Sequence, residues 1–187
     1  KKLLDLSQRN AKYFRLEKEK QFGQKFSRTY GDVLLEAIKK DLNLPVKPVK
    51  IECFDNSNFQ GAEPAAACVV FKNGKPSKRE YRHYNIKTVE GQDDFASMEE
   101  IVFRRYSRLL KENKELPQLI VIDGGKGQLT SAIHALEKLD LRGKISVISI
   151  AKRLEEIYYP DDPVPVYINK NSETLRVIQY LRDEAHR

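Results

Sequence analysis

Two short apolar runs, each ending in an aspartate, constrain what this chain can fold into. One run is Ile51-Glu52-Cys53-Phe54-Asp55, and the other is Leu119-Ile120-Val121-Ile122-Asp123. Both are bounded by turn residues and are too short for helices, so they predict buried strands. The carboxyl ends of strands in an open α/β sheet form the crevice where such folds place their chemistry. We therefore expect Asp55 and Asp123 to lie at that edge.

A pair of carboxylates at one sheet edge indicates a metal site. Neighbouring carboxylates repel each other unless a positive charge lies between them, and hard divalent ions such as Mg²⁺ take oxygen ligands of this kind. An acid that follows a strand can also cap a turn or the next helix, and this alternative stays open for each aspartate taken singly. The joint placement of Asp55 and Asp123 favours the metal site.

Charge and cysteine usage limit the class of protein. The chain has 187 residues, 40% of them hydrophobic, and we expect neither a membrane span nor a secretory signal. Residues 1–50 carry all of the net charge of +7, with 13 Lys and Arg against 6 acids. Such a segment can bind a polyanion, although a solvated helix face has the same composition. Cys53 and Cys68 have neither metal-ligand nor disulfide spacing, which predicts buried thiols in a cytoplasmic protein.

The remaining pattern predicts an α/β domain behind a basic helical segment. Residues 1–46 form that segment, in which apolar residues recur loosely at helical spacing among many charges, and prolines at 45 and 48 mark a linker. Residues 47–187 form the domain. Its expected elements are strands at 49–54, 65–71 and about 77–86, a helix at 95–110 capped by Asp93 or Asp94, a strand at 119–123, a helix at 128–139, a strand at 145–150 and a helix at 173–187 capped by Ser172.

This order is similar to the layout of the ribonuclease H-like fold. Asn73-Gly74 predicts a hairpin between the second and third strands, so the first three strands form an antiparallel meander. Alternating helices and parallel strands follow, and the first and fourth strands of such a mixed sheet lie side by side. On this layout Asp55 and Asp123 fall at neighbouring strand ends. The likeness is an analogy at the level of the fold and does not assign a function.

Three glycines surround Lys126 directly after the second aspartate, in Gly124-Gly125-Lys126-Gly127. Between a strand and a helix, glycines allow close backbone approach or positive φ, and the helix start offers amide groups to a phosphate. Lys126 would add a cation there. The segment lacks the spacing and the Ser or Thr of a nucleotide-binding P-loop. A purely structural turn explains the same residues.

Asp183 and His186 lie three residues apart in the last predicted helix and therefore share a face. A neutral imidazole beside a carboxylate suits a metal ligand or a proton shuttle. Ordinary solvated helix surface is the alternative. We interpret His83, in a basic strand, and His134, in a helix, as structural.

The hairpin at residues 72–87 alternates cations with tyrosines. Lys78, Arg79 and Arg82 are among its six Lys and Arg residues, and Glu80 is its single acid. Cations interleaved with aromatic rings suit a surface that binds a nucleic-acid backbone. An exposed edge strand protected by lysines has a similar composition.

Five ordered blocks resemble the C-terminal nuclease domain of the UvrC family, the incision subunits of bacterial nucleotide excision repair. The resemblance extends from about residue 50 to residue 187, with compatible spacing throughout. The blocks are Phe54-Asp55-Asn56-Ser57 with Gln60-Gly61, Asp93-Asp94-Phe95 with Arg104-Arg105-Tyr106, Ile122 to Leu129, Ile150-Ala151-Lys152, and Ile178 to Arg187.

The resemblance implies a ribonuclease H-like endonuclease that cuts DNA on the 5′ side of a lesion with Mg²⁺ or Mn²⁺. The catalytic positions of the family fall on Asp55, Asp123 and His186, which would also form the metal site. A further acid implicated in the same cut falls on Asp94 or on its neighbour Asp93.

Further basic residues are expected to contact the DNA backbone. We expect Lys126 and Lys152 to offset phosphate charge and Lys78, Arg79 and Arg82 to follow the strand. The family usually has His where this chain has Asn58, so any role of that imidazole is missing here or is performed elsewhere.

UvrC proteins also have an amino-terminal nuclease domain, a segment that binds UvrB and terminal helix-hairpin-helix units. We therefore expect this chain to be an excised domain of a cytoplasmic protein. Its expected partners are damaged double-stranded DNA and, through parts outside the chain, UvrB and indirectly UvrA. Two alternatives stay open: a non-catalytic DNA-binding or scaffolding module, and another ribonuclease H-like nuclease such as a junction resolvase.

Overall fold

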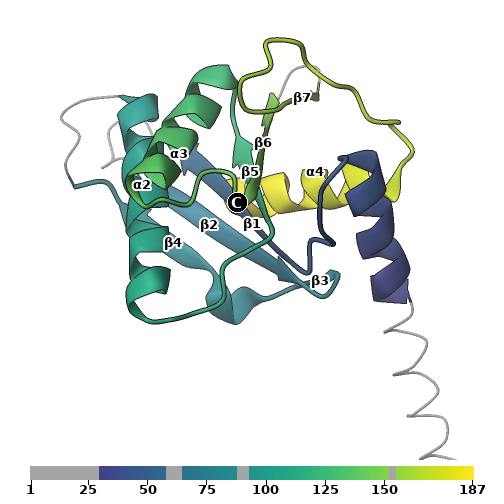
Figure 1. Cartoon of the computed structure of the whole chain (residues 1–187), viewed down its shortest axis with the longest axis horizontal. Helices are drawn as coiled ribbons and strands as arrows, with labels where there is room; N and C mark the ends of the chain where they lie inside the picture. The colour runs from purple at the N-terminus through teal and green to yellow at the C-terminus, as the bar shows by residue number, and fades with distance from the viewer. Residues whose placement is uncertain (1–29, 58–64, 88–92, 152–154) are drawn as a thin grey trace, which may run out of the picture.

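A mixed β-sheet forms the centre of the computed structural model, which describes residues 30–57, 65–87, 93–151 and 155–187. Seven strands in this part of the chain make one sheet with the order β3-β2-β1-β5-β6-β7, and β4 also pairs with β2 (Figure 1). The strands are β1 Lys50–Ser57, β2 Ala65–Lys72, β3 Lys75–Pro76, β4 Arg82–Asn85, β5 Leu119–Asp123, β6 Ser146–Ala151 and β7 Glu156–Tyr158.

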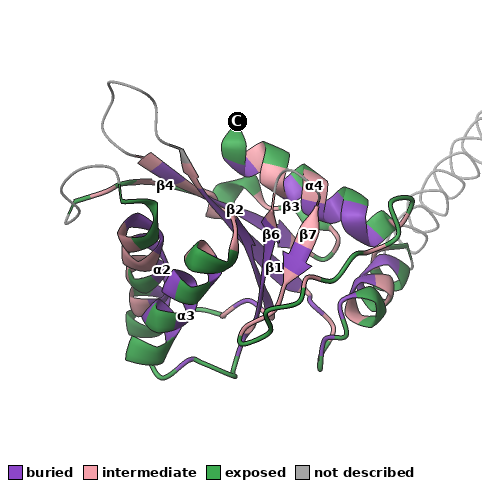
Figure 2. Ribbon diagram, turned by 90° about the horizontal axis from the view of Figure 1, so that it is seen from above, coloured by how far each residue is buried: buried purple, intermediate pink, exposed green. Residues whose placement is uncertain are grey.

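Helices cover both faces of the sheet. Helices α2 (Asp94–Lys111) and α3 (Lys126–Lys138) pack on one face, and α4 (Glu173–His186) packs on the other together with the helix at residues 30–41 (Figures 1 and 2). Each face therefore has its own apolar core, and the two cores are separated by the strands. No helix among the described residues is both long enough and apolar enough to span a membrane.

The strand directions confirm the predicted mixed sheet. β1 pairs antiparallel with β2, and β2 pairs antiparallel with β4, which gives the expected meander. β1 then pairs in parallel with β5, and β5 pairs in parallel with β6. The first long strand and the strand that ends at Asp123 are thus direct neighbours, as the ribonuclease H-like layout requires.

The third predicted strand, at about 77–86, is wrong in its first half. Lys78–Glu80 form a short 3₁₀ helix, η1, and only Arg82–Asn85 continue as β4. Pro76 has no N–H to donate to a ladder, and Ser77 donates from its hydroxyl to the Glu80 carboxylate at 3.0 Å. Glu80 also accepts from the buried Lys50 ammonium at 3.0 Å. The hydrogen bond from Ser77 to Glu80 and the ion pair of Glu80 with Lys50 therefore favour a turn over a strand here.

The helix at residues 30–41 belongs to the core in its described part. Leu34, Leu35 and Ile38 are buried among residues of the sheet and of α4. The side chain of Thr174, in the first turn of α4, donates to Asp41 at 2.6 Å. The domain boundary predicted at residue 46 stays a prediction, and residues 1–29 lie outside the described part.

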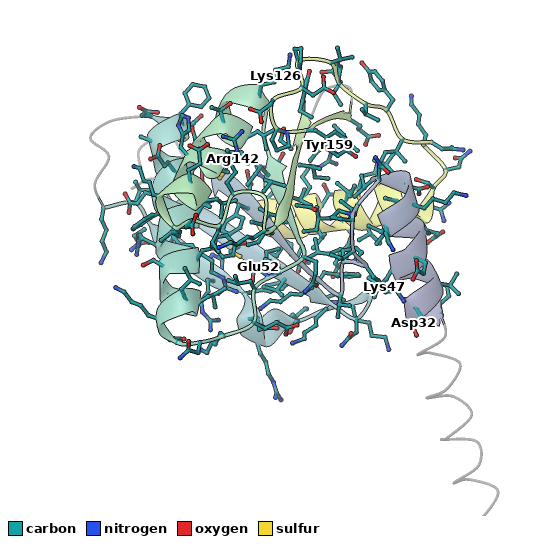
Figure 3. The ribbon with its side chains drawn as sticks, in the orientation of Figure 1. Asp32, Lys47, Glu52, Lys126, Arg142 and Tyr159 are labelled. Atoms are coloured by element: carbon teal, nitrogen blue, oxygen red, sulfur yellow. The ribbon has the colours of Figure 1, made fainter. Side chains whose placement is uncertain are left out.

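A buried ionic cluster fastens β1 to α2. Glu52 is fully buried and accepts from the Arg105 guanidinium, with 2.6 Å from Nη2 to Oε1 and 3.2 Å from Nε to Oε2. The Tyr106 hydroxyl donates to the same carboxylate at 2.9 Å, and the Lys50 ammonium lies 3.5 Å away. Figure 3 shows Glu52 near the middle of the molecule. A buried charge is tolerated when hydrogen bonds and opposite charges surround it in this way.

We predict that replacing Arg105 with Leu destabilises the chain by about 3 to 5 kcal/mol. The substitution removes the guanidinium from the buried Glu52 carboxylate and leaves it with the more distant Lys50 ammonium, 3.5 Å away. Urea unfolding followed by circular dichroism measures the change. Arg108→Leu is the matched control, because Arg108 pairs with Glu112 at the exposed surface of the same helix and its loss should leave the midpoint unchanged. Equal midpoints for the two variants would contradict the assigned role of the cluster.

The two cysteines are buried, as predicted, and their burial shields the thiols from reagents in the solvent. Cys53 and Cys68 are fully buried on β1 and β2. Burial, with the nearby Glu52 carboxylate, raises the pKa of the Cys68 thiol well above its usual value, so the reactive thiolate is scarce at neutral pH. We predict that an aromatic disulfide reagent labels neither thiol in the folded chain and labels both in 6 M guanidinium. Rapid labelling of the folded chain would disprove this.

Candidate active site

The pairing of β1 with β5 places the two aspartates side by side. Phe54 and Ile122 are Cα partners in the parallel ladder, and Asp55 and Asp123 follow them directly. Because successive side chains of a strand point to opposite faces, both acids point to the side of the sheet that α4 covers. They are 2% and 3% exposed. The structure thus gathers two carboxylates at the carboxyl ends of neighbouring strands.

His186 reaches this pair from α4. Its Nδ1 lies 2.9 Å from Oδ2 of Asp55, although the two residues are 131 positions apart in the chain. Leu181 and Ala185 of the same helix are buried against the sheet and hold the last turn in place. The His186 side chain is 63% exposed, so its ring joins a buried carboxylate to the solvent. Asp183, by contrast, pairs with the neighbouring Arg182 at the surface.

The donor set fits a hard divalent ion. Asp55 and Asp123 supply carboxylate oxygens from adjacent strands, which is the ligand type that Mg²⁺ and Mn²⁺ prefer. Within the described ranges, no three His, Cys, Asp or Glu side chains form a ready-made metal cluster. His186 contacts Asp55 directly. The site thus consists of two neighbouring carboxylates, with the imidazole of His186 in contact with one of them.

Asp93 and Asp94, at the start of α2, make different contacts. The Asp93 carboxylate caps the helix, because it accepts from the backbone N–H groups of Phe95 and Ala96 at 3.0 Å each. Asp94 is exposed, and its carbonyl accepts from the side chain of Asn56 at 2.9 Å. Asn56 directly follows Asp55, so this bond holds Asp94 at the aspartate-bearing end of β1. Of the two acids, Asp94 is therefore the candidate for a role in the site.

The glycine-rich segment after Asp123 is a tight strand-to-helix turn. Gly125 donates its backbone N–H to the Gln128 side chain at 2.8 Å, and a Cβ at Gly124 would lie 2.0 Å from that same side-chain oxygen. A Cβ at Gly127 would lie 2.3 Å from the ring of Phe95. Close approach, rather than positive φ, explains Gly124 and Gly127, whereas a Cβ at Gly125 would meet nothing within 4 Å.

Lys126 contacts protein groups at this turn. Its ammonium donates to the carbonyl of Pro163 and lies 5.0 Å from the centre of the Tyr158 ring. Figure 3 shows it at the outer end of the molecule, next to the loop that follows β7. Lys126 thereby fastens that loop to α3, and its predicted contact with phosphate stays a prediction. Lys152 and Asn58 lie outside the described residues.

Arg82 of the basic hairpin lies on the other face of the sheet from the acids. Arg82 pairs in register with Cys68 and so points to the side of α2, whereas Asp55 points to the side of α4. Its guanidinium donates to the carbonyls of Arg79 and Tyr81. With basic residues of α2, it lines a hollow of about 500 Å³. The predicted contact of Lys78, Arg79 and Arg82 with nucleic acid stays a prediction.

One family model matches residues 39–187 and is described as the UvrC RNAse H endonuclease domain. The chain belongs to this family. UvrABC system protein C of Flavobacterium johnsoniae is 62% identical over 187 residues, and that of Christiangramia forsetii is 63% identical over the same length. Each comparison covers 100% of this chain and 31% of the relative, so the chain spans about a third of the curated relatives it matches. The predicted membership and the ribonuclease H-like fold class are confirmed.

Solved structures give weaker likenesses. A DNA complex of Ciona intestinalis endonuclease V has a TM-score of 0.43 and 19% identity, covering 89% of this chain and 68% of that one. Human ENDOV has a TM-score of 0.43 and 12% identity, covering 82% of this chain and 67% of that one. Scores at this level add nothing to the assignment.

We predict that Asp123→Asn makes the metal-free chain more stable, because it removes repulsion between neighbouring carboxylates worth about 1 to 3 kcal/mol at an effective dielectric of about 20. Adding Mg²⁺ or Mn²⁺ should raise the thermal midpoint of the unsubstituted chain and leave that of the variant unchanged. Asp140→Asn is the control, because Asp140 is fully exposed and should show neither effect. A destabilised Asp123→Asn that still responds to metal would favour the turn-capping alternative.

Proposed function

We propose that this chain is the domain that cuts damaged DNA on the 5′ side of a lesion in bacterial nucleotide excision repair, by metal-assisted hydrolysis of a phosphodiester. The contact between His186 and Asp55, beside Asp123, carries the proposal. It joins an acid from a strand to an imidazole from the last helix, both at positions that the family motifs predict. The membership in the family supports the same activity.

Asp55 and Asp123 would hold Mg²⁺ or Mn²⁺ through their carboxylate oxygens. When bound, such an ion activates water and stabilises the charge that develops on the phosphate oxygens. The two acids are held in position because β1 and β5 lie in the middle of the sheet. No covalent bond to the protein is needed, since water is the nucleophile.

His186 would handle protons at the edge of the site. Its bond to Asp55 fixes the orientation of the ring and favours a proton on Nδ1, as carboxylate partners of histidines do. The exposed ring can then exchange a proton with water or with the leaving oxygen. In the alternative role as a third metal ligand, His186 would bind through Nε2 while Nδ1 keeps its bond to Asp55, or through Nδ1 after the ring turns away from Asp55.

The whole protein would supply what this chain lacks. UvrB, and UvrA indirectly, would deliver the domain to damaged double-stranded DNA in the cytoplasm. Lys126, Lys152 and the hairpin cations would then contact phosphates. The charge excess of residues 1–50 suits the same polyanion.

We predict that Asp55→Ala and Asp123→Ala in the full-length protein abolish the 5′ cut and leave the 3′ cut unchanged, because only the 5′ site loses its metal-binding oxygens. A lesion-containing duplex labelled at either end, incubated with the repair partners, resolves the two cuts. Asp140→Ala is the matched control and should cut normally at both positions. Normal 5′ incision by either site variant would remove the proposed role, and metal-independent DNA retention without any cut would favour a binding module.

We further predict that His186→Ala slows the 5′ cut by about 10²- to 10⁴-fold, the usual contribution of a positioned acid or base. The same variant should keep the metal-induced rise in thermal midpoint, because both carboxylates remain. Loss of that rise would instead assign His186 as a metal ligand. Single-turnover incision and thermal unfolding are therefore measured on the same preparation.

A further inference from the structure

Phe95 is an exposed aromatic ring in the first turn of α2. It is 54% exposed, whereas Met98, Ile101 and Val102 of the same helix are fully buried. Single exposed apolar side chains are common on protein surfaces, so exposure alone carries no meaning. The surroundings of the ring and its position in the fold distinguish Phe95.

The ring of Phe95 packs against the first turn of α3. A Cβ at Gly127 would lie 2.3 Å from its Cε1 and 2.7 Å from its Cζ, so a side chain at that position would displace the ring. The backbone of Phe95 is anchored as well, because its N–H donates to the capping carboxylate of Asp93. Phe95 thus contacts α3 through one edge of its ring and presents the rest to the solvent.

Phe95 also lies between the two strand ends that carry the acids. On one side, Asp94 accepts a hydrogen bond from Asn56, the residue after Asp55. On the other side, the contact with Gly127 places the ring four residues after Asp123 in the chain. The ring therefore lies at the edge of the sheet where β1 and β5 end, beside residues that follow the two acids in the chain.

We propose that Phe95 is a stacking site for an unpaired nucleobase next to the phosphate that is cut. This inference rests on the proposed nuclease function and adds a substrate preference to it. An exposed aromatic ring offers a π-face on which every base can stack. A base is available for stacking only where the duplex is opened or distorted. The site therefore selects distorted DNA strands by the availability of a base, independently of sequence.

Binding of short single strands tests the proposal without requiring cleavage. The Asp123→Asn chain, in which cleavage is blocked, is titrated into single-stranded oligonucleotides that carry the fluorescent base 2-aminopurine. Stacking on Phe95 quenches the base. Phe95→Leu, which keeps the apolar contact with Gly127, should weaken binding about 5- to 100-fold and abolish the quenching, whereas Phe95→Trp should retain both. Circular dichroism verifies that each variant is folded.

Two further variants make the test specific. Phe103→Leu is the matched control, because Phe103 is an exposed phenylalanine of the same helix, 37% exposed, and should bind and quench like the parent. Gly127→Ala should displace the ring and reproduce the loss seen in Phe95→Leu. Unchanged binding and quenching in Phe95→Leu, or equal losses in Phe103→Leu, would overturn the proposal. The proposal would also be overturned if Phe95→Leu bound and quenched the oligonucleotides normally and weakened only the binding of a protein partner.

Failure of the stacking proposal and failure of the proposed function give different results. If the domain cuts DNA in a metal-dependent reaction but Phe95→Leu neither weakens binding nor lowers the preference for distorted over regular duplex, only the stacking site is wrong. If Phe95→Leu weakens binding while the unsubstituted protein cuts no DNA with Mg²⁺ or Mn²⁺, the nuclease assignment is wrong and the base contact stands.

Discussion

The parallel pairing of β1 with β5 is the interaction on which the rest of the structure depends. It aligns Phe54 with Ile122, and so brings the following aspartates level with each other. A slip of one residue would turn one carboxylate to the opposite face of the sheet. The slip is prevented by burial on both sides, because Cys53 and Val121 fill the core under α4 while Phe54 and Ile122 fill the core under α2 and α3. Two ordinary apolar cores therefore position an unfavourable pair of charges.

β1 carries two acids, Glu52 and Asp55, whose surroundings differ. Glu52 points toward α2, where Arg105, Tyr106 and Lys50 surround it with donors. Asp55, three residues later, points toward α4 and contacts the imidazole of His186. The first acid fixes the strand to α2. The second lies at the strand end beside another carboxylate, which is an arrangement that a cation stabilises.

The sequence predicted the parts of the fold that short-range pattern determines. The apolar runs before Asp55 and Asp123, the meander and the Ser172 cap of α4 were readable, because strand ends and caps depend on a few neighbouring residues. The break of the third strand at η1 was not readable, since it depends on Glu80 reaching Lys50, 30 residues away. The ion pair of Glu52 with Arg105 likewise joins positions 53 apart.

The candidate site shows the same limit. The motifs predicted Asp55, Asp123 and His186 as partners, and the structure brings Asp55 and His186 into contact, but their chemical roles stay predictions. Phe95 lies at helical spacing from Met98 and Val102, a pattern that by itself predicts a shared buried face. The structure exposes the ring instead, and its edge meets α3 at Gly127. Only the packing of one helix against another reveals this.

Two layers of the fold form the site, and their contributing residues are far apart along the chain. The sheet holds both carboxylates, and α4 carries the imidazole on its final turn. A rotation of α4 by a single residue, about 100°, would swing the imidazole away while the strands stayed as they are. The angular setting of this helix, fixed by Leu181 and Ala185 in the core, therefore decides whether the imidazole reaches the Asp55 carboxylate.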